Sequence, residues 1–233
     1  MSGIREVCFD TETTGFHARG DDRITELGSI ELIDMIPTGK QYHAYLNPQR
    51  DVPEKVTQIT GLTTDFLKKN GQYFADVAAE FLEFVGDSKL IAHNANFDKA
   101  FINAELEKAG HPIFPNDRFI DTLQMAREKF PGSPASLDAL CKRYGISLSS
   151  RDKHGAIIDS ELLAEVYLQL KGGRMRNLDL DNSVPETITP IAKDQARERP
   201  SPLSSNLSTD QIKDHKHYIK SLGEKMVWNK YWR

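Results

Sequence analysis

The spacing of apolar residues changes from a strand period to a helix period along this chain, which limits the folds it can adopt. Three short, apolar segments rich in strand-forming residues lie near the N-terminus, at residues 4–9, 23–34 and 41–46. Each predicts a β-strand, and Pro37–Gly39 predicts the turn between the second and the third. Three strands so close in sequence favour an antiparallel meander.

From residue 73 onward the apolar residues follow a helical period. One stripe over residues 73–85 holds Phe74, Val77, Ala78, Phe81, Leu82 and Val85. A short strand is predicted over 89–92, and further helices over 97–109, 136–144 and 155–170. Asn96 is the predicted N-cap of the first of these helices, and Gly172–Gly173 ends the last. Strands followed by mixed helices and strands indicate an α/β core.

The composition shifts after Gly173. Residues 174–208 are rich in Pro, Ser, Asn and charged residues, which is typical of a linker, and residues 209–228 regain a helical pattern. We therefore expect a folded domain over 1–173, a flexible linker over 174–208 and a C-terminal segment over 209–233.

Composition excludes several classes of protein. The chain has only two cysteines, Cys8 and Cys141, too few for a disulfide-stapled fold or for a cysteine-based zinc or iron–sulfur site of its own. No apolar run approaches about 18 residues, and no signal peptide is evident, so a cytoplasmic protein is expected. The net charge of -4 does not favour a protein that grips nucleic acid unaided, although metal ions and a partner could supply positive charge.

Carboxylates occur at three places where the predicted elements begin or end. Asp10 and Glu12 follow the first strand, which we expect to stop at Asp10, and their spacing of two directs both to one face. Asp98 lies in the first turn of a predicted helix. Taken singly, these residues also suit an ordinary turn and a favourable helix N-terminus.

The third place is the segment from His154 to Asp159. Five residues on a regular helix would point the two side chains apart, but Gly155 indicates that His154 precedes the helix and can fold back. Asp159 is expected on the inner side of that helix, near the edge of the core. A partly buried aspartate needs a partner, either a metal or a nearby cation such as Arg151 or Lys153.

Taken together, the carboxylates predict a metal site. Asp10, Glu12, Asp98 and Asp159 can converge only if cations offset their repulsion, and hard divalent cations prefer such oxygen ligands. Two such ions form the usual site for phosphodiester hydrolysis, and a nearby histidine can accept a proton from the attacking water.

Three motifs, FDTETTG, HNANFD and HGAIIDSELLAEVYL, resemble in order and rough separation those of the DEDDh branch of the DnaQ-like 3′–5′ exonucleases. ITELGSIEL, FPGSPASLDALCKRYGI and LAEVYLQLKGG further resemble the proofreading, epsilon-type subunits of bacterial replicative DNA polymerases. The resemblance covers about residues 4–173. It implies a ribonuclease-H-like α/β fold, with a mixed five-stranded sheet flanked by helices, and two divalent cations, Mg²⁺ or Mn²⁺.

The resemblance also implies roles for individual residues. It makes Asp10, Glu12, Asp98 and Asp159 the metal-binding carboxylates, of which Asp10, Glu12 and Asp159 also contact substrate, and His154 the catalytic general base. The further substrate contacts it implies are Thr13, Gly15, Glu54, Thr60 and Phe97. Many relatives have a histidine where this chain has Thr60, and core packing is an equal alternative for Phe97.

The implied function is proofreading, the removal of mispaired 3′-terminal nucleotides from DNA. An RNA-trimming 3′–5′ exoribonuclease of the same superfamily would use the same chemistry, although the long tail after Gly173 is unusual for such enzymes. A non-catalytic adaptor in a replication complex is disfavoured because the carboxylate-and-histidine set is complete.

The C-terminal segment is expected to bind a partner. Ile212, Ile219, Leu222 and Met226 fall on one stripe of an amphipathic helix, and Trp228 and Trp232 lie in the last six residues. We expect Ile219, Leu222, Trp228 and Trp232 to anchor the chain to an alpha-type polymerase subunit, since aromatic residues are common binding hot spots. Folding back onto the exonuclease domain is the alternative. A small accessory subunit and a sliding clamp are further expected partners. The clamp would contact Leu178 and Leu180, although the Gln that leads the clamp-binding motif of relatives is missing from residues 174–180.

Overall fold

A computed structural model describes residues 3–149, 153–173 and 207–221. Of the described residues, those up to Gly173 belong to one unit and residues 207–221 to another. Within the described residues, no helix is long and apolar enough to cross a membrane.

A five-stranded mixed sheet forms the centre of the first unit, in the order β3-β2-β1-β4-β5. Its strands are β1 (Arg5–Thr13), β2 (Ile24–Ile33), β3 (Ile36–Tyr45), β4 (Lys89–Ala92) and β5 (Phe119–Asp121). The first three pair antiparallel, which confirms the predicted meander, while β4 runs parallel to both β1 and β5. The fold class expected from the sequence is therefore confirmed.

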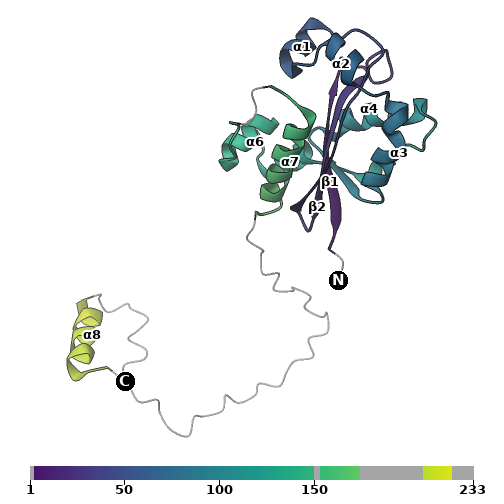
Figure 1. Ribbon diagram of the computed structural model, residues 1–233. Coiled ribbons are helices and arrows are strands. Elements are labelled where there is room, and N and C mark those ends of the chain that lie inside the picture. Colours follow the sequence, from purple (N-terminus) through teal and green to yellow (C-terminus); the bar gives the residue numbers. More distant parts are fainter. Residues whose placement is uncertain (1–2, 150–152, 174–206, 222–233) are drawn as a thin grey trace. The chain divides into compact units, whose positions relative to one another are not determined.

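Helices cover both faces of this sheet (Figure 1). They are α1 (Glu54–Thr60), α2 (Thr64–Asn70), α3 (Phe74–Val85), α4 (Ala95–Lys108), α5 (Thr122–Lys129), α6 (Leu137–Tyr144) and α7 (Ala156–Leu170), with a 3-10 turn at Asn116–Arg118. Helices α3 and α4 bury their apolar stripes against one face, around Phe9 and Leu90. Helix α7 packs on the other face, where Tyr167 and Leu163 meet Cys8.

The turn between β2 and β3 is not where the sequence predicted it. It lies at Asp34 and Met35, with φ values of 50° and 66°, and Ile33 pairs directly with Ile36. Two residues with positive φ match the right-handed twist of a tight hairpin. The predicted turn at Pro37–Gly39 is therefore wrong: these residues lie inside β3, beside an irregularity in its register.

Other boundaries also differ from the prediction. Helix α4 begins at Ala95, and its N-cap is Asn94 in the left-handed conformation, so the prediction of Asn96 is wrong. Strand β1 continues through Asp10 to Thr13, because β2 pairs with it along that whole length. The short helices α1, α2 and α5 and the three-residue β5 lack a long apolar period, and the sequence did not predict them.

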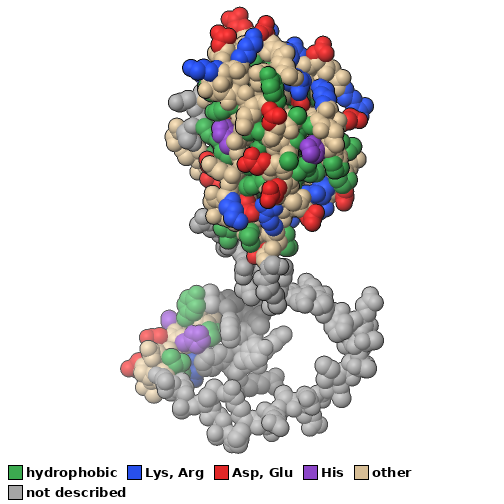
Figure 2. All heavy atoms as spheres, turned by 45° about the vertical axis from the view of Figure 1, so that its right-hand side comes forward, with side chains coloured by type: hydrophobic (Ala, Val, Ile, Leu, Met, Phe, Trp, Pro, Cys, Tyr) green, Lys and Arg blue, Asp and Glu red, His purple; other side chains and the backbone are tan. Residues whose placement is uncertain are grey.

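On the face of the first unit drawn in Figure 2, acidic and basic side chains are interspersed. This mixture agrees with the slightly negative net charge of the chain. It offers no broad basic surface on that face for gripping nucleic acid.

Candidate active site

Two carboxylates leave β1 on the face that α7 covers. Asp10 and Glu12 are half-buried, whereas Thr11 and Thr13 are buried. The alternation follows from the strand period of two, and it places both carboxylates on the same side as Cys8, which packs against α7. The predicted spacing argument therefore holds, although the acids lie inside the strand rather than after it.

A glycine in the neighbouring strand allows α7 to approach these acids. Gly28 is the ladder partner of Asp10, and a Cβ atom on it would lie 2.3 Å from the backbone carbon of Ala156. The hydroxyl of Ser160 donates to the Gly28 carbonyl at 3.0 Å. The first turn of α7 consequently rests on the strand beside Asp10, and it carries Asp159 to the same place.

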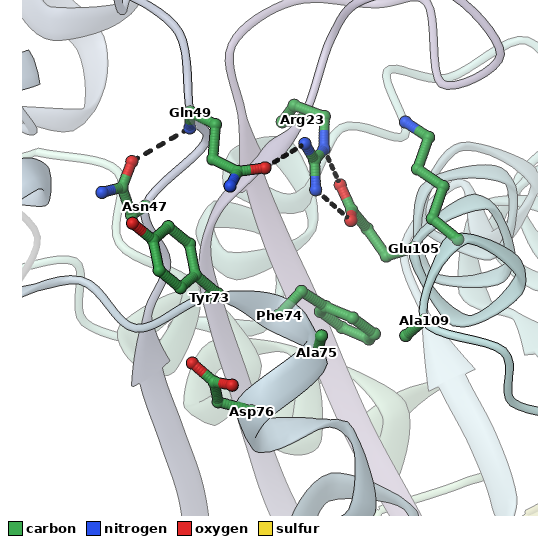
Figure 3. A pocket seen from close by; sticks show the side chains of 10 residues that line it. Arg23, Asn47, Gln49, Tyr73, Phe74, Ala75, Asp76, Glu105 and Ala109 are labelled. Atoms are coloured by element: carbon green, nitrogen blue, oxygen red, sulfur yellow. Dashed lines mark hydrogen bonds and ion pairs between the residues drawn. The ribbon is translucent and has the colours of Figure 1, made fainter.

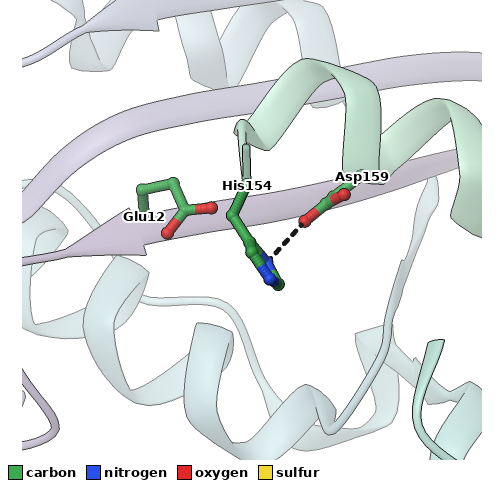
Figure 4. Close-up of side chains that lie close together, drawn as sticks. All are labelled: Glu12, His154 and Asp159. Atoms are coloured by element: carbon green, nitrogen blue, oxygen red, sulfur yellow. Dashed lines mark ion pairs between the residues drawn. The ribbon is translucent and has the colours of Figure 1, made fainter. Parts of the chain in front are cut away.

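His154, Glu12 and Asp159 form a compact group at this point (Figure 4). One ligand atom from each of the three lies within 4.8 Å of the others. The Nδ1 atom of His154 is 3.3 Å from Oδ2 of Asp159, whose side chain is 5% exposed, while that of His154 is 48% exposed. His154 precedes α7 and folds back as the sequence predicted. Its backbone N–H donates to the Ile59 carbonyl in α1 at 3.2 Å, which fixes the segment from outside the helix.

Asp98 lies in the first turn of α4, just after β4, and is not among the three residues that gather within 4.8 Å of one another. Its carboxylate is buried and accepts two hydrogen bonds from Thr11, from the backbone N–H at 3.1 Å and from the hydroxyl at 2.8 Å. Burial, assisted by the charge of Asp121 and opposed by the Thr11 hydrogen bonds, raises the pKa of Asp98 to about 7. Because Thr11 lies between Asp10 and Glu12 in β1, this anchor ties the start of α4 to the part of β1 that carries both acids.

These donors suit a hard divalent cation. The carboxylates of Glu12 and Asp159 supply oxygen ligands of the kind that magnesium and manganese sites use, and His154 places an imidazole beside them. Several acids gathered around one strand repel one another, and the raised pKa of Asp98 shows that its charged form is disfavoured. A bound cation would reverse both effects.

Three of the predicted substrate contacts lie at the end of β1, in the turn after it and at the start of α4: Thr13, Gly15 and Phe97. The hydroxyl of Thr13 donates to the Gly15 carbonyl at 2.6 Å and so shapes the turn that follows β1. Phe97 is half-buried, with its ring centroid 4.9 Å from that of Phe101 and 6.3 Å from that of Phe16. Phe16 is 83% exposed, and the sequence pattern did not single it out.

The two predicted contacts in α1 differ in exposure. Glu54 is exposed in the first turn of α1, where it accepts a hydrogen bond from Gln58. Thr60 is buried, its hydroxyl donating to the Val56 carbonyl at 3.0 Å and accepting from the Leu62 N–H at 3.1 Å. Thr60 thus shapes the end of the helix in this structure.

The second unit contains α8 (Thr209–Ser221), within the predicted C-terminal segment. Along α8, Ile219 is buried and Ile212 is half-buried, and the seven-residue separation places both on one stripe as expected. The other predicted anchors, Leu222, Trp228 and Trp232, lie outside the described residues.

The sequence patterns single out neither of two residues that position the site, Gly28 and Thr11. A glycine inside a strand is a sign of close backbone approach, and this signal could have drawn attention to Gly28. No local signal marks Thr11, because its partner Asp98 is 87 residues away.

Comparison with known proteins identifies the family of this chain. The Exonuclease family matches residues 7–167. The DNA polymerase III subunit epsilon of Rickettsia felis is 41% identical over 227 residues, covering 95% of this chain and 98% of the relative. That of Haemophilus influenzae is 34% identical, covering 98% of this chain and 94% of the relative.

Solved structures support the fold. Exonuclease X, in complex with 5′-overhanging duplex DNA, matches 70% of this chain and 89% of its own, with a TM-score of 0.57 and 23% identity. Exonuclease I matches 72% of this chain and 40% of its own, with a TM-score of 0.61 and 19% identity. The family match and the relatives, which align along nearly the whole chain, point to the same family. The chain belongs to the exonuclease family, and within it to the epsilon subunits of DNA polymerase III, which are divalent-metal-dependent 3′–5′ proofreading exonucleases.

Proposed function

We propose that this epsilon-type exonuclease removes mispaired 3′-terminal nucleotides from DNA by metal-assisted hydrolysis, with Asp10, Glu12, Asp98 and Asp159 as metal ligands and His154 as general base. The observation that carries the proposal is the meeting of Glu12, His154 and Asp159 within 4.8 Å at the end of β1. We further propose two cations, Mg²⁺ or Mn²⁺. When bound, they would polarise the phosphate and stabilise the charge that develops on the attacking and leaving oxygens.

His154 is suited to take a proton from water. The carboxylate of Asp159 lies 3.3 Å from Nδ1, so it favours the tautomer with a proton on Nδ1 and leaves Nε2 as the acceptor. The imidazole is about half exposed, which gives an attacking water access to it. Its backbone hydrogen bond to Ile59 restricts the movement of the segment that carries it.

The surroundings of the site suit the terminal nucleotide. The half-buried ring of Phe97 and the exposed ring of Phe16, whose centroids are 6.3 Å apart, offer apolar faces on which a base can stack. Thr13 and Gly15 place a hydroxyl and backbone groups next to Glu12. We assign Glu54 and Thr60 in α1 as substrate contacts. Because the hydroxyl of Thr60 is bonded within the end of α1, Thr60 would act indirectly, by shaping that end of the helix.

The chain would act within a polymerase assembly. Relatives are named as subunits of DNA polymerase III, and we propose that residues 209–233 bind the polymerase subunit, with residues 174–208 as the tether. A polymerase that holds the DNA would account for the slight negative charge of this chain. We also propose a small accessory subunit and a sliding clamp as partners, with the clamp bound near Leu178 and Leu180. The proposed location is the cytoplasm.

Hydrolysis of a 3′-mismatched DNA primer with Mg²⁺ tests the activity, against a matched primer and an RNA strand of the same sequence. We expect faster release of the mismatched nucleotide, because its end is already frayed and the free-energy cost of unpairing is small. We also expect no activity in excess EDTA, and none in Asp10→Ala, which should remain folded. Full activity in EDTA would contradict the metal mechanism, and preference for the RNA strand would favour the RNA-trimming alternative.

A further inference from the structure

The turn that follows β1 is held by a carboxylate outside the metal-binding group. The side chain of Asp22 is 13% exposed. Its Oδ1 atom accepts a hydrogen bond from the Thr14 hydroxyl at 3.0 Å and pairs with Nη1 of Arg50 at 3.0 Å. Its Oδ2 atom accepts the backbone N–H of His17 at 3.0 Å. One carboxylate therefore contacts two points of the turn and one distant segment.

Gly15 lies directly against this carboxylate. A Cβ atom on Gly15 would stand 2.4 Å from Oδ2 of Asp22, closer than real Cβ contacts come. The absence of a side chain at position 15 thus allows the turn to close around Asp22. The Gly15 carbonyl also accepts the hydroxyl of Thr13, so both sides of the turn are tied down three residues beyond Glu12.

Asp22 itself stands on a rigid support. Thr14 and Arg23 exchange hydrogen bonds, from the Thr14 N–H to the Arg23 carbonyl at 2.9 Å and from the Arg23 N–H to the Thr14 hydroxyl at 3.0 Å. The Arg23 guanidinium grips both oxygens of Glu105 on α4, at 2.5 and 2.7 Å, and reaches Gln49 at 3.3 Å (Figure 3). Arg23, directly before β2, is therefore bonded to α4, and Asp22 is its neighbour in the chain.

The neighbours of Asp22 favour its charged form. Burial alone would raise its pKa, but the N–H of His17, the hydroxyl of Thr14 and the charge of Arg50 outweigh burial and lower the pKa below its ordinary value. Arg50 belongs to the segment that leads into α1, and the Ile59 carbonyl of α1 holds the backbone of His154. Asp22 thus joins the turn after Glu12 to the segment before α1.

We propose that Asp22 is a positioning residue for the exonuclease reaction. It holds the Thr13–Gly15 turn in the shape that receives the terminal nucleotide, and it acts through Gly15 without touching the reacting atoms. This role rests on the proposed function of that turn. It predicts that loss of Asp22 weakens substrate binding more than turnover, and that positions 15 and 22 act as one unit.

A double-mutant cycle on the full chain tests this role, with single-stranded DNA as substrate and Mg²⁺ present. The variants are Asp22→Ala, Gly15→Ala and the double variant, and Asp21→Ala is the control because it removes an exposed acid from the adjacent position. We expect Asp22→Ala to raise KM by about tenfold, the effect of losing hydrogen bonds to a charged group, with a smaller change in kcat. Asp21→Ala should leave both parameters within about twofold.

The cycle should be strongly non-additive. Gly15→Ala should lower kcat/KM by a much larger factor in the wild-type background than in Asp22→Ala, because the atom that the new methyl group meets is then gone. If Asp22→Ala does not fold, Asp22→Asn keeps the side-chain volume, and its KM should still rise. An additive cycle, or an unchanged KM in an active enzyme, would overturn the role of Asp22 alone. A wild-type chain that hydrolyses no DNA would overturn the proposed function and this role with it.

Discussion

At the scale of single residues, His154 and Asp98 occupy opposite kinds of environment. The imidazole is half exposed and reachable by water, whereas the Asp98 carboxylate is 2% exposed and bonded to Thr11. The first arrangement suits a group that exchanges protons with solvent, and the second suits a ligand that must stay fixed. Each environment leads to a different expectation for mutation.

We expect His154→Ala to lower kcat by about 10²–10⁴, the usual effect of losing a general base, with a weaker effect on KM. His111→Ala is the matched control, because it removes a histidine beyond the far end of α4 and should leave kcat unchanged. Steady-state hydrolysis of single-stranded DNA measures both variants. A loss of less than about tenfold would reduce His154 to a structural role at the start of α7.

We expect Asp98→Asn to abolish activity while preserving or increasing stability in excess EDTA. The amide oxygen can still accept the Thr11 hydrogen bonds, and the variant avoids burying a charge. Thermal unfolding followed by circular dichroism, together with the DNA hydrolysis assay, checks both parts. A variant that unfolds more easily without metal would show that the Asp98 charge is stabilised by the protein itself.

At the scale of elements, two contacts determine how the helices sit on the sheet. Gly28 lets the first turn of α7 lie on β2, and Arg5 attaches β1 to the end of α3. The first contact depends on a missing side chain, and the second on a guanidinium that donates to the carbonyls of Phe84 and Val85 and to Glu31. Only the first is next to the site.

We expect Gly28→Ala to impair both activity and stability. The new methyl group would overlap the backbone of Ala156, and relief of that overlap must move α7, and with it Asp159, away from Asp10. Overpacking of this kind costs about 1–3 kcal/mol. Unfolding in urea and kcat measure the two effects, and Gly20→Ala is a milder glycine control, since its nearest contacts would be at 3.3 Å. Equal activity in both variants would show that the position of α7 tolerates this change.

We expect Arg5→Ala to lower stability at neutral pH by about 1–3 kcal/mol, because charged hydrogen bonds are lost from a part-buried site. The Thr38 hydroxyl, followed by Arg5, lowers the pKa of Glu31 from its ordinary value of 4.5 despite burial. A carboxylate with a lowered folded-state pKa stabilises the fold above the unfolded value, and that contribution disappears as the pH falls through the folded value. The difference between wild type and variant should therefore shrink below pH 4.5.

Unfolding curves recorded between neutral and acidic pH check this expectation. Lys40→Ala is the control, because its ammonium group is 75% exposed and lies 3.6 Å from Glu31. Such an exposed pair contributes about 0–1 kcal/mol. A constant difference across the whole pH range would mean that Arg5 acts through α3 rather than through Glu31.

At the scale of the whole molecule, the exonuclease unit and the C-terminal segment have separable roles in the proposed function. All the carboxylates of the site belong to the first unit, and the proposed partner segment belongs to the second. Truncation after Ser208 should leave hydrolysis of short single strands intact and abolish co-elution with the polymerase subunit. A truncated chain that still binds that subunit as tightly as the full chain would place the anchor elsewhere.

The sequence by itself determined the types of the long elements and predicted the chemistry of the site. The apolar period identified β1, β2, α3 and α7, and the motifs singled out Glu12, His154 and Asp159, which the fold brings together, since each pattern depends on neighbours in sequence. Tertiary structure decided what local pattern cannot contain. It placed the hairpin turn at Asp34–Met35, anchored Asp98 on Thr11 and seated α7 on Gly28. The last two depend on packing between segments about 90 to 130 residues apart, and the energy of such contacts exists only when the chain has folded.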